Sequence, residues 1–238
     1  MACDQWQTDE DKLQLQAFQT FKRALGPEHP TTLDSLSDLA MKYFEKDRLK
    51  EALDLQLELV DGRKRVQGLD HPSTILSMSN LGGQYLKQER WSEAEVILRQ
   101  AVEGAKKVFG IESASTLTVI ANLSAALQNQ NRFDEAVVMI TEVNEIYTRN
   151  QGEEEMPTIA STRMLAGVLR GAGRLDEARE KLGKVKEICS RKLGPDHEIT
   201  ISIAGELRSI QDGPGQLERL QALNKEKRYV KIDIGQLR

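Results

Sequence analysis

The stretch GPEHPTTL at residues 26–33 recurs 42 residues later as GLDHPSTI at residues 68–75. Weaker copies, each led by glycine, begin at Gly110, Gly152 and Gly194, so the step is kept without insertion. A fixed period of this size is typical of solenoids, in which each repeat buries its apolar face against its neighbours. The repeat therefore predicts an extended binding surface in place of a single catalytic cleft.

The period divides the chain into a half repeat, four full repeats and a degenerate end. The predicted segments are residues 1–25, 26–67, 68–109, 110–151, 152–193 and 194–238. The half repeat aligns with the second helix of a repeat alone, through the stripe Leu13, Ala17, Phe18, Phe21 and Leu25. In the last segment we expect a degenerate second helix at Leu217 to Asn224. Residues 229–234 alternate in polarity and are either strand-like or an unstructured tail.

Within each repeat the pattern predicts two helices. Apolar residues from Ile75 to Tyr85 fall three or four positions apart, as on one face of a helix. In the first repeat we expect helices at about 32–46 and 49–66, separated by a short turn. A threonine near the start of every first helix is expected to cap free backbone amides. These threonines are Thr32, Thr74, Thr116, Thr158 and Thr200.

Four columns of similar residues mark the turn and the start of the second helix. They are Arg48, Arg90, Arg132 and Arg174; Leu49, Trp91, Phe133 and Leu175; Glu51, Glu93, Glu135 and Glu177; and Ala52, Ala94, Ala136 and Ala178. An alanine at one place in every repeat indicates that two helices approach too closely for a larger side chain. The glutamate lies in the first helical turn, where the helix dipole favours an acid.

Composition argues against several functional classes. The net charge of −4 and pI near 5.6 do not favour nucleic-acid binding, which needs a basic face. The two cysteines, Cys3 and Cys189, have no zinc-binding or disulfide spacing. No long apolar run or signal peptide is present, so we expect a cytoplasmic protein that neither enters a membrane nor needs a cofactor.

The second repeat resembles the tetratricopeptide repeat. Counted from Ile75, its residues match the fourth, seventh, eighth, eleventh, twentieth, twenty-fourth and twenty-seventh places of that pattern: Met78, Leu81, Gly82, Tyr85, Ala94, Leu98 and Ala101. The usual period there is about 34 residues. The longer form resembles the repeats of kinesin light chains and of arrays that end many fungal and bacterial NTPase receptors. The sequence shows neither the heptads of the former nor the GxxxxGK[ST] motif of the latter.

The resemblance implies an all-α, right-handed superhelical solenoid of antiparallel helix pairs whose first helices line a concave groove for a peptide. The fifth, sixth and ninth places of these helices are then candidate contacts. They are Ser37, Asp38 and Met41; Ser79, Asn80 and Gly83; Ala121, Asn122 and Ala125; and Arg163, Met164 and Gly167. From this set we predict a peptide-binding groove formed by Asp38, Met41, Ser79, Asn80, Asn122 and Arg163.

Asn80 and Asn122 carry the most weight, because they match the asparagines with which related arrays grip a peptide backbone. A side-chain amide suits this role since it donates and accepts at once. The alternative is that both are solvated helix residues. Charge along the groove also changes from acidic at Asp38 to basic at Arg163, which would favour a ligand of opposite polarity, although the mixed surface of an ordinary helical array is the preferred explanation. The cationic clamp for a C-terminal carboxylate is not reproduced.

Other recurring residues have simpler explanations. His29, His71 and His197 are too dispersed for a metal site, and we expect hydrogen-bonding turn residues. A basic column near the ends of the second helices is expected to cap them: Arg23, Arg65, Lys107, Arg149 and Arg191. The acidic run at residues 153–155 lies in a loop without a partner base, and we interpret it as solvated.

These observations predict a protein–protein interaction scaffold, monomeric in this form, that binds an extended or helical segment of a partner protein. A sensing or oligomerising region of an NTPase receptor is the alternative within the binding class. A helical enzyme is disfavoured because no nucleophile and base converge in the pattern, and a passive spacer is a further possibility.

Overall fold

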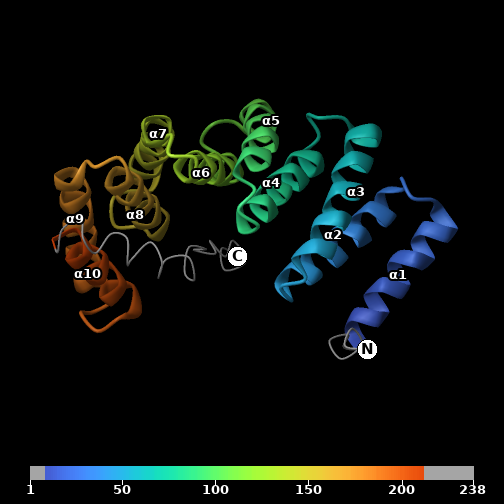
Figure 1. Cartoon of the computed structure of the whole chain (residues 1–238), viewed down its shortest axis with the longest axis horizontal. Coiled ribbons are helices and arrows are strands. Elements are labelled where there is room, and N and C mark those ends of the chain that lie inside the picture. The colour runs from blue at the N-terminus through green and yellow to red at the C-terminus, as the bar shows by residue number, and fades with distance from the viewer. Residues whose placement is uncertain (1–8, 212–238) are drawn as a thin grey trace. The chain divides into compact units, whose positions relative to one another are not determined.

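The computed structural model describes residues 9–211, and these form ten α-helices and no strand (Figure 1). The helices are α1 (Asp9–Leu25), α2 (Pro30–Glu45), α3 (Leu49–Gln67), α4 (Pro72–Lys87), α5 (Trp91–Phe109), α6 (Ala114–Asn129), α7 (Phe133–Gln151), α8 (Met156–Gly171), α9 (Leu175–Lys192) and α10 (Glu198–Gln211). The all-α prediction is confirmed. The predictions for Leu217 to Asn224 and for residues 229–234 lie outside the described residues.

The helices belong to two compact units. One unit extends to Arg132 and contains α1 to α6, and the other begins at Phe133 and contains α7 to α10. Within each unit every helix packs on the next, and in the first unit α4 also contacts α6. Among the described residues no helix is both long enough and apolar enough to cross a bilayer.

The turn between paired helices depends on a left-handed residue followed by arginine. The left-handed residue is Asp47, Glu89, Asn131 or Gly173. In the first repeat Arg48 then donates to Glu51, which lies in the first turn of α3, and stacks over the Tyr43 ring at 4.0 Å. Arg90 and Arg174 bind the glutamate three residues ahead in the same way, which explains why arginine and glutamate recur together.

Histidine, not threonine, caps α2, α4 and α10, which are three of the five first helices. The Nδ1 atoms of His29, His71 and His197 accept a hydrogen bond from the backbone N–H two residues later, each at 3.2 Å. The turn role expected for histidine is confirmed, and the threonine cap is wrong. In each first helix the threonine is the third helical residue and lies inside the first turn; the Thr200 hydroxyl, for example, donates to the Gly194 carbonyl at 2.9 Å.

Replacement of His71 with alanine tests this cap. Loss of a side-chain acceptor at a helix N-terminus costs about 1 kcal/mol, so we expect the unfolding free energy of H71A to fall by about that amount. Urea unfolding followed by circular dichroism measures the change. If H71A matches the wild type while Thr74→Val is destabilised, the cap assignment fails.

Small residues permit the close packing inside each repeat pair. Ala52, Ala94, Ala136 and Ala178 are all fully buried, as the alanine column predicts. Gly82 of α4 faces Leu98 of α5 so closely that a Cβ atom at position 82 would lie 2.4 Å from the leucine side chain. The core of each unit is therefore a series of tight helix contacts and has no single centre.

The basic column lies in the last turns of the second helices, as expected, and three of its five residues also bind loop carboxylates. Arg65 binds Glu28 at 2.7 Å, and Lys107 and Arg191 bind Asp70 and Glu154 in the same manner. Each pair joins the end of a second helix to the glycine-led loop of the same repeat. The pairs are exposed, and such pairs contribute at most about 1 kcal/mol. The 153–155 run is thus exposed but partly paired.

Candidate binding surface

In the first unit, the exposed faces of α2, α4 and α6 that carry Asp38, Asn80 and Asn122 form what we call the inner wall. Arg63 of α3 holds α2 and α4 side by side. Its guanidinium donates to Asp34 of α2 at 2.7 Å and to the Ser77 hydroxyl of α4 at 2.6 Å, and also to the Ser73 carbonyl at 3.0 Å. The Arg63 side chain is only 8% exposed, so this link lies directly beneath the wall.

The other end of the same helices is also joined. Lys87 of α4 binds Asp47 at 2.7 Å and lies over the Phe44 ring of α2 at 4.7 Å. Because α4 also contacts α6, the helices α2, α4 and α6 form a continuous row. A residue at a given place on one helix therefore lies beside the same place on its neighbour.

The two candidate asparagines share one place on neighbouring helices. Asn80 and Asn122 are half-buried, and neither side chain has a hydrogen-bond partner within residues 9–211. Gly83 lies just under one turn after Asn80, and a Cβ atom there would meet nothing within 4 Å. The wall thus offers two unpaired amides beside open space. Ser79, by contrast, is only 7% exposed and contributes little accessible surface.

Acidic and apolar side chains flank these amides. Asp38 and Glu45 of α2 are exposed and have no ion-pair partner in the described part of the chain. Met41 of α2 is 41% exposed, and Leu76 of α4 is 45% exposed. Sequence reasoning missed Leu76, although it is the one large apolar residue in a column whose other members in the full repeats are Asp34, Thr118 and Ala160.

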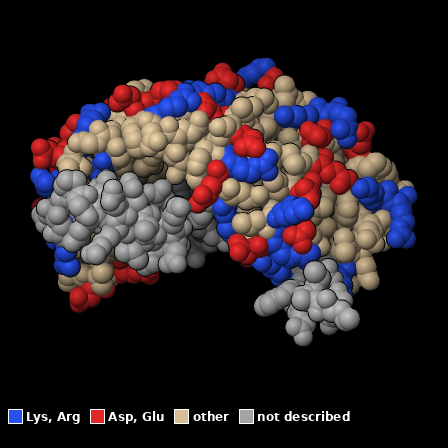
Figure 2. Space-filling view, in the orientation of Figure 1, with Lys and Arg blue, Asp and Glu red and all other residues tan. Residues whose placement is uncertain are grey.

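Arg163 belongs to α8 of the second unit, where it already forms an ion pair. It donates to Glu206 of α10 and, at 3.0 Å, to the Ser202 hydroxyl. Arg170 of α8 similarly donates to Ser209 at 3.2 Å. A ligand carboxylate would therefore compete with Glu206 for Arg163. Figure 2 shows acidic and basic side chains intermixed on the face in view.

The shifted ionisable groups are structural. A hydrogen bond from Arg90 lowers the pKa of Glu93. Burial alone would raise the pKa of Glu95, but hydrogen bonds from Gln130, Arg132 and Arg99 outweigh it and lower the pKa overall. Burial raises the pKa of the Cys189 thiol, which favours its neutral form. Among the described residues no group of three His, Cys, Asp or Glu side chains could hold a metal ion.

Comparisons with known families agree with this architecture. One tetratricopeptide repeat profile matches residues 43–107 and 73–149, and a second matches residues 158–198, together more than half of the chain. No curated protein sequence matches the chain significantly. The helix-pair solenoid predicted from the 42-residue period is therefore confirmed.

Solved structures show the same fold. The nearly identical TPR-like repeats assigned to a kinesin light chain of Podosopora anserina match with 27% identity and a TM-score of 0.71, over 77% of this chain and 87% of that one. BtubC (BKLC) from P. vanneervenii matches with 16% identity and a TM-score of 0.64, over 91% and 92%. A Rap protein complexed with competence and sporulation factor matches with 11% identity and a TM-score of 0.58, over 94% and 66%.

Proposed function

Because this chain is a member of the tetratricopeptide repeat family, we propose that it is a protein-interaction scaffold whose inner wall holds an extended segment of a partner protein. The observation that carries the proposal is the pair of unpartnered amides, Asn80 and Asn122, at one place on contacting helices. An amide in this position can donate to a peptide carbonyl and accept from a peptide N–H. Two of them in a row suit a repeating backbone.

The neighbours of the amides suggest the chemistry of the bound segment. Asp38 and Glu45 would attract a lysine or arginine of the ligand at the α2 side of the wall. Met41 and Leu76 offer exposed apolar surface to a large ligand side chain, and Gly83 leaves room for it. Arg163 stays a predicted contact for an acidic ligand residue, which would have to displace Glu206.

A peptide selection tests the proposal without assuming a particular partner. A random peptide library displayed on phage is selected against the purified chain, and the enriched peptides are titrated by fluorescence anisotropy. Each amide contributes about 1 kcal/mol net, so the double substitution Asn80→Ala and Asn122→Ala should weaken the dissociation constant about 30-fold. Peptides with a basic residue should dominate the selection.

Gln100→Ala is the matched control, because this amide lies exposed on α5, outside the inner wall. Its affinity for the selected peptides should equal that of the wild type. Unchanged affinity in the double asparagine variant, with its helix content intact, would remove these residues from the binding site. The proposal assigns no catalytic role to the chain, and the cytoplasmic location and monomeric state remain predictions.

A further inference from the structure

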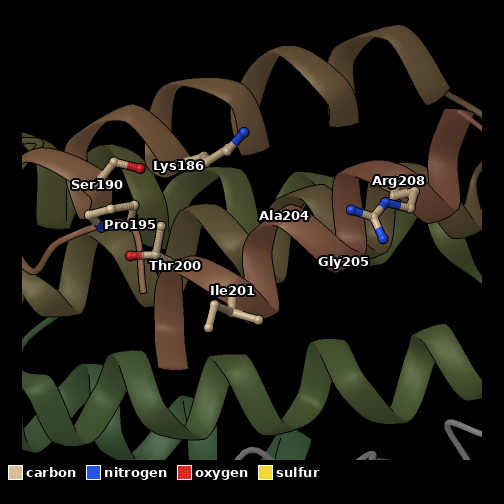
Figure 3. Close-up of a pocket in the computed structure, with 8 residues that line it drawn as sticks. All are labelled: Lys186, Ser190, Pro195, Thr200, Ile201, Ala204, Gly205 and Arg208. Carbon is tan, nitrogen blue, oxygen red and sulfur yellow. The ribbon is translucent and has the colours of Figure 1, made fainter. Parts of the chain in front are cut away.

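A second surface lies at the far end of the second unit, between α9 and α10 (Figure 3). A hollow of about 340 Å³ opens between the two helices. Its lining includes Lys186 and Ser190 of α9 and Ile201, Ala204, Gly205 and Arg208 of α10. We call this hollow the end seat.

The end seat corresponds to a place that holds a helix elsewhere in the chain. In the first unit, the space formed by α3 and α4 receives α5, where Ile75 contacts Gly104 and Gly82 contacts Leu98. Ile201 occupies the place of Ile75 three periods on. The earlier members of this column, Ile75, Leu117 and Ile159, are at most 3% exposed, whereas Ile201 is 58% exposed. Within residues 9–211, no helix covers this place as α5 covers its counterpart.

Two positions that line the end seat are charged, whereas the corresponding positions of earlier repeats are not. Lys186 stands where α3 and α5 have the buried residues Val60 and Val102. Arg208 stands where α4 and α8 have Gly82 and Ala166. Neither cation has a partner within residues 9–211. A helix that presented only apolar side chains to Lys186 and Arg208 would leave both charges without a partner on docking, which is costly.

We propose that the end seat docks an amphipathic helix of a partner protein that carries carboxylates on its docking face. Apolar side chains of that helix cover Ile201 and Ala204, and its carboxylates bind Lys186 and Arg208. The contacts of the first unit give the positions. Gly82 of α4 faces Leu98 of α5. Because Arg208 is the counterpart of Gly82, it faces the position of the docked helix that corresponds to Leu98, which in α9 is occupied by Leu182. Lys64 of α3 donates to Gln100 of α5 at 3.2 Å. Lys186 lies one turn before the residue of α9 that corresponds to Lys64. It therefore faces the position of the docked helix one turn before that of Gln100, which in α9 is occupied by Glu180.

Segments of the same sequence have no carboxylate at the place that would face Arg208. In the 42-residue register, the place facing Arg208 falls on Asn224 in the residues that follow α10. The same place in α1 of a second copy is Gln14. Both are neutral amides. Moreover, Leu220 falls at the place where Ala178 and its counterparts allow two helices to approach closely, and leucine is larger than alanine. Charge complementarity therefore favours a separate partner.

The probe is a hydrocarbon-stapled, fluorescein-labelled peptide with the α9 sequence, in which Leu182→Glu supplies the carboxylate for Arg208 and Cys189→Ser prevents oxidation. It is titrated against the full chain by fluorescence anisotropy. We expect saturable binding that weakens at least tenfold in Lys186→Glu with Arg208→Glu. The control Lys50→Glu with Lys106→Glu changes the net charge equally at exposed sites and should bind as the wild type does. A probe with lysine at positions 180 and 182 should restore binding to the reversed chain.

Several results would overturn the proposal. It fails if the wild type does not bind the probe, if the charge-reversed chain binds equally, or if a peptide that keeps Leu182 binds as tightly. Binding that appears only after Leu217→Asp with Leu220→Asp would assign the end seat to the chain's own residues. Self-association in sedimentation velocity that Arg208→Glu abolishes would assign it to a second copy.

Discussion

Replacing Gly82 with valine is expected to destabilise the first unit by about 3 kcal/mol, the upper part of the range for overpacked cores. A Cβ atom at position 82 would lie 2.4 Å from both the Cγ and a Cδ atom of Leu98. Leu98 is fully buried, so its side chain has no free direction in which to move. The helices α4 and α5 must separate, which breaks the contact that defines this repeat. Urea unfolding followed by circular dichroism measures the loss.

The next residue supplies a matched control. Gly83 lies on the same helix, but a Cβ atom there meets nothing within 4 Å. Gly83→Val should therefore keep or slightly raise stability, because glycine in a helix interior costs about 1 kcal/mol relative to alanine. Since stability in a repeat array is approximately a sum over neighbours, hydrogen exchange should locate the G82V loss in α4 and α5. Equal stability of the two variants would contradict the packing described for this repeat.

Replacing Arg63 with alanine should also cost about 3 kcal/mol, because two polar groups of α4 lose a buried donor and the missing side chain leaves a cavity. Arg63 alone connects Asp34 of α2 with Ser73 and Ser77 of α4. Without it the Ser73 carbonyl and the Ser77 hydroxyl lose a donor beneath the inner wall. Asp34 is 70% exposed and can return to water, so most of the loss falls on α4.

Two further variants separate charge from packing at this position. Arg63→Met keeps most of the volume and should lose less than Arg63→Ala, since apolar replacement of a buried ionic group is often tolerated. Arg65→Ala removes the exposed pair with Glu28 and should change stability by less than about 1 kcal/mol. Thermal unfolding by calorimetry compares the three variants. An Arg63→Ala loss no larger than that of Arg65→Ala would refute the assigned link between α2 and α4.

The 42-residue columns were sufficient to predict the helices and their tight contacts. A column of alanine or a glycine at a fixed place reflects a steric requirement that every repeat shares, so it is visible in sequence. The turn arginines are visible for the same reason. The cap was assigned to the wrong residue because threonine and histidine both recur near the helix start. Only the position of the first helical residue decides between them.

Features that occur in one repeat alone could not be found in this way. Arg63 stands in a column with Ala105 and Cys189, so no recurrence indicates its links to Asp34 and Ser77. The pairing of Arg163 with Glu206 likewise depends on side-chain conformations across two helices. Leu76 could have been noticed as a large apolar residue in a column of polar and small ones. Its exposure, however, follows from the direction of the inner wall, which the sequence does not give.

A crystal structure of the chain with a peptide from the phage selection would show directly whether the inner wall binds a peptide. We predict an extended peptide along the inner wall, with the side-chain amides of Asn80 and Asn122 in hydrogen-bonding contact with its backbone and a basic residue near Asp38. A peptide bound to the second helices, or one that leaves both asparagines without contact, would contradict it.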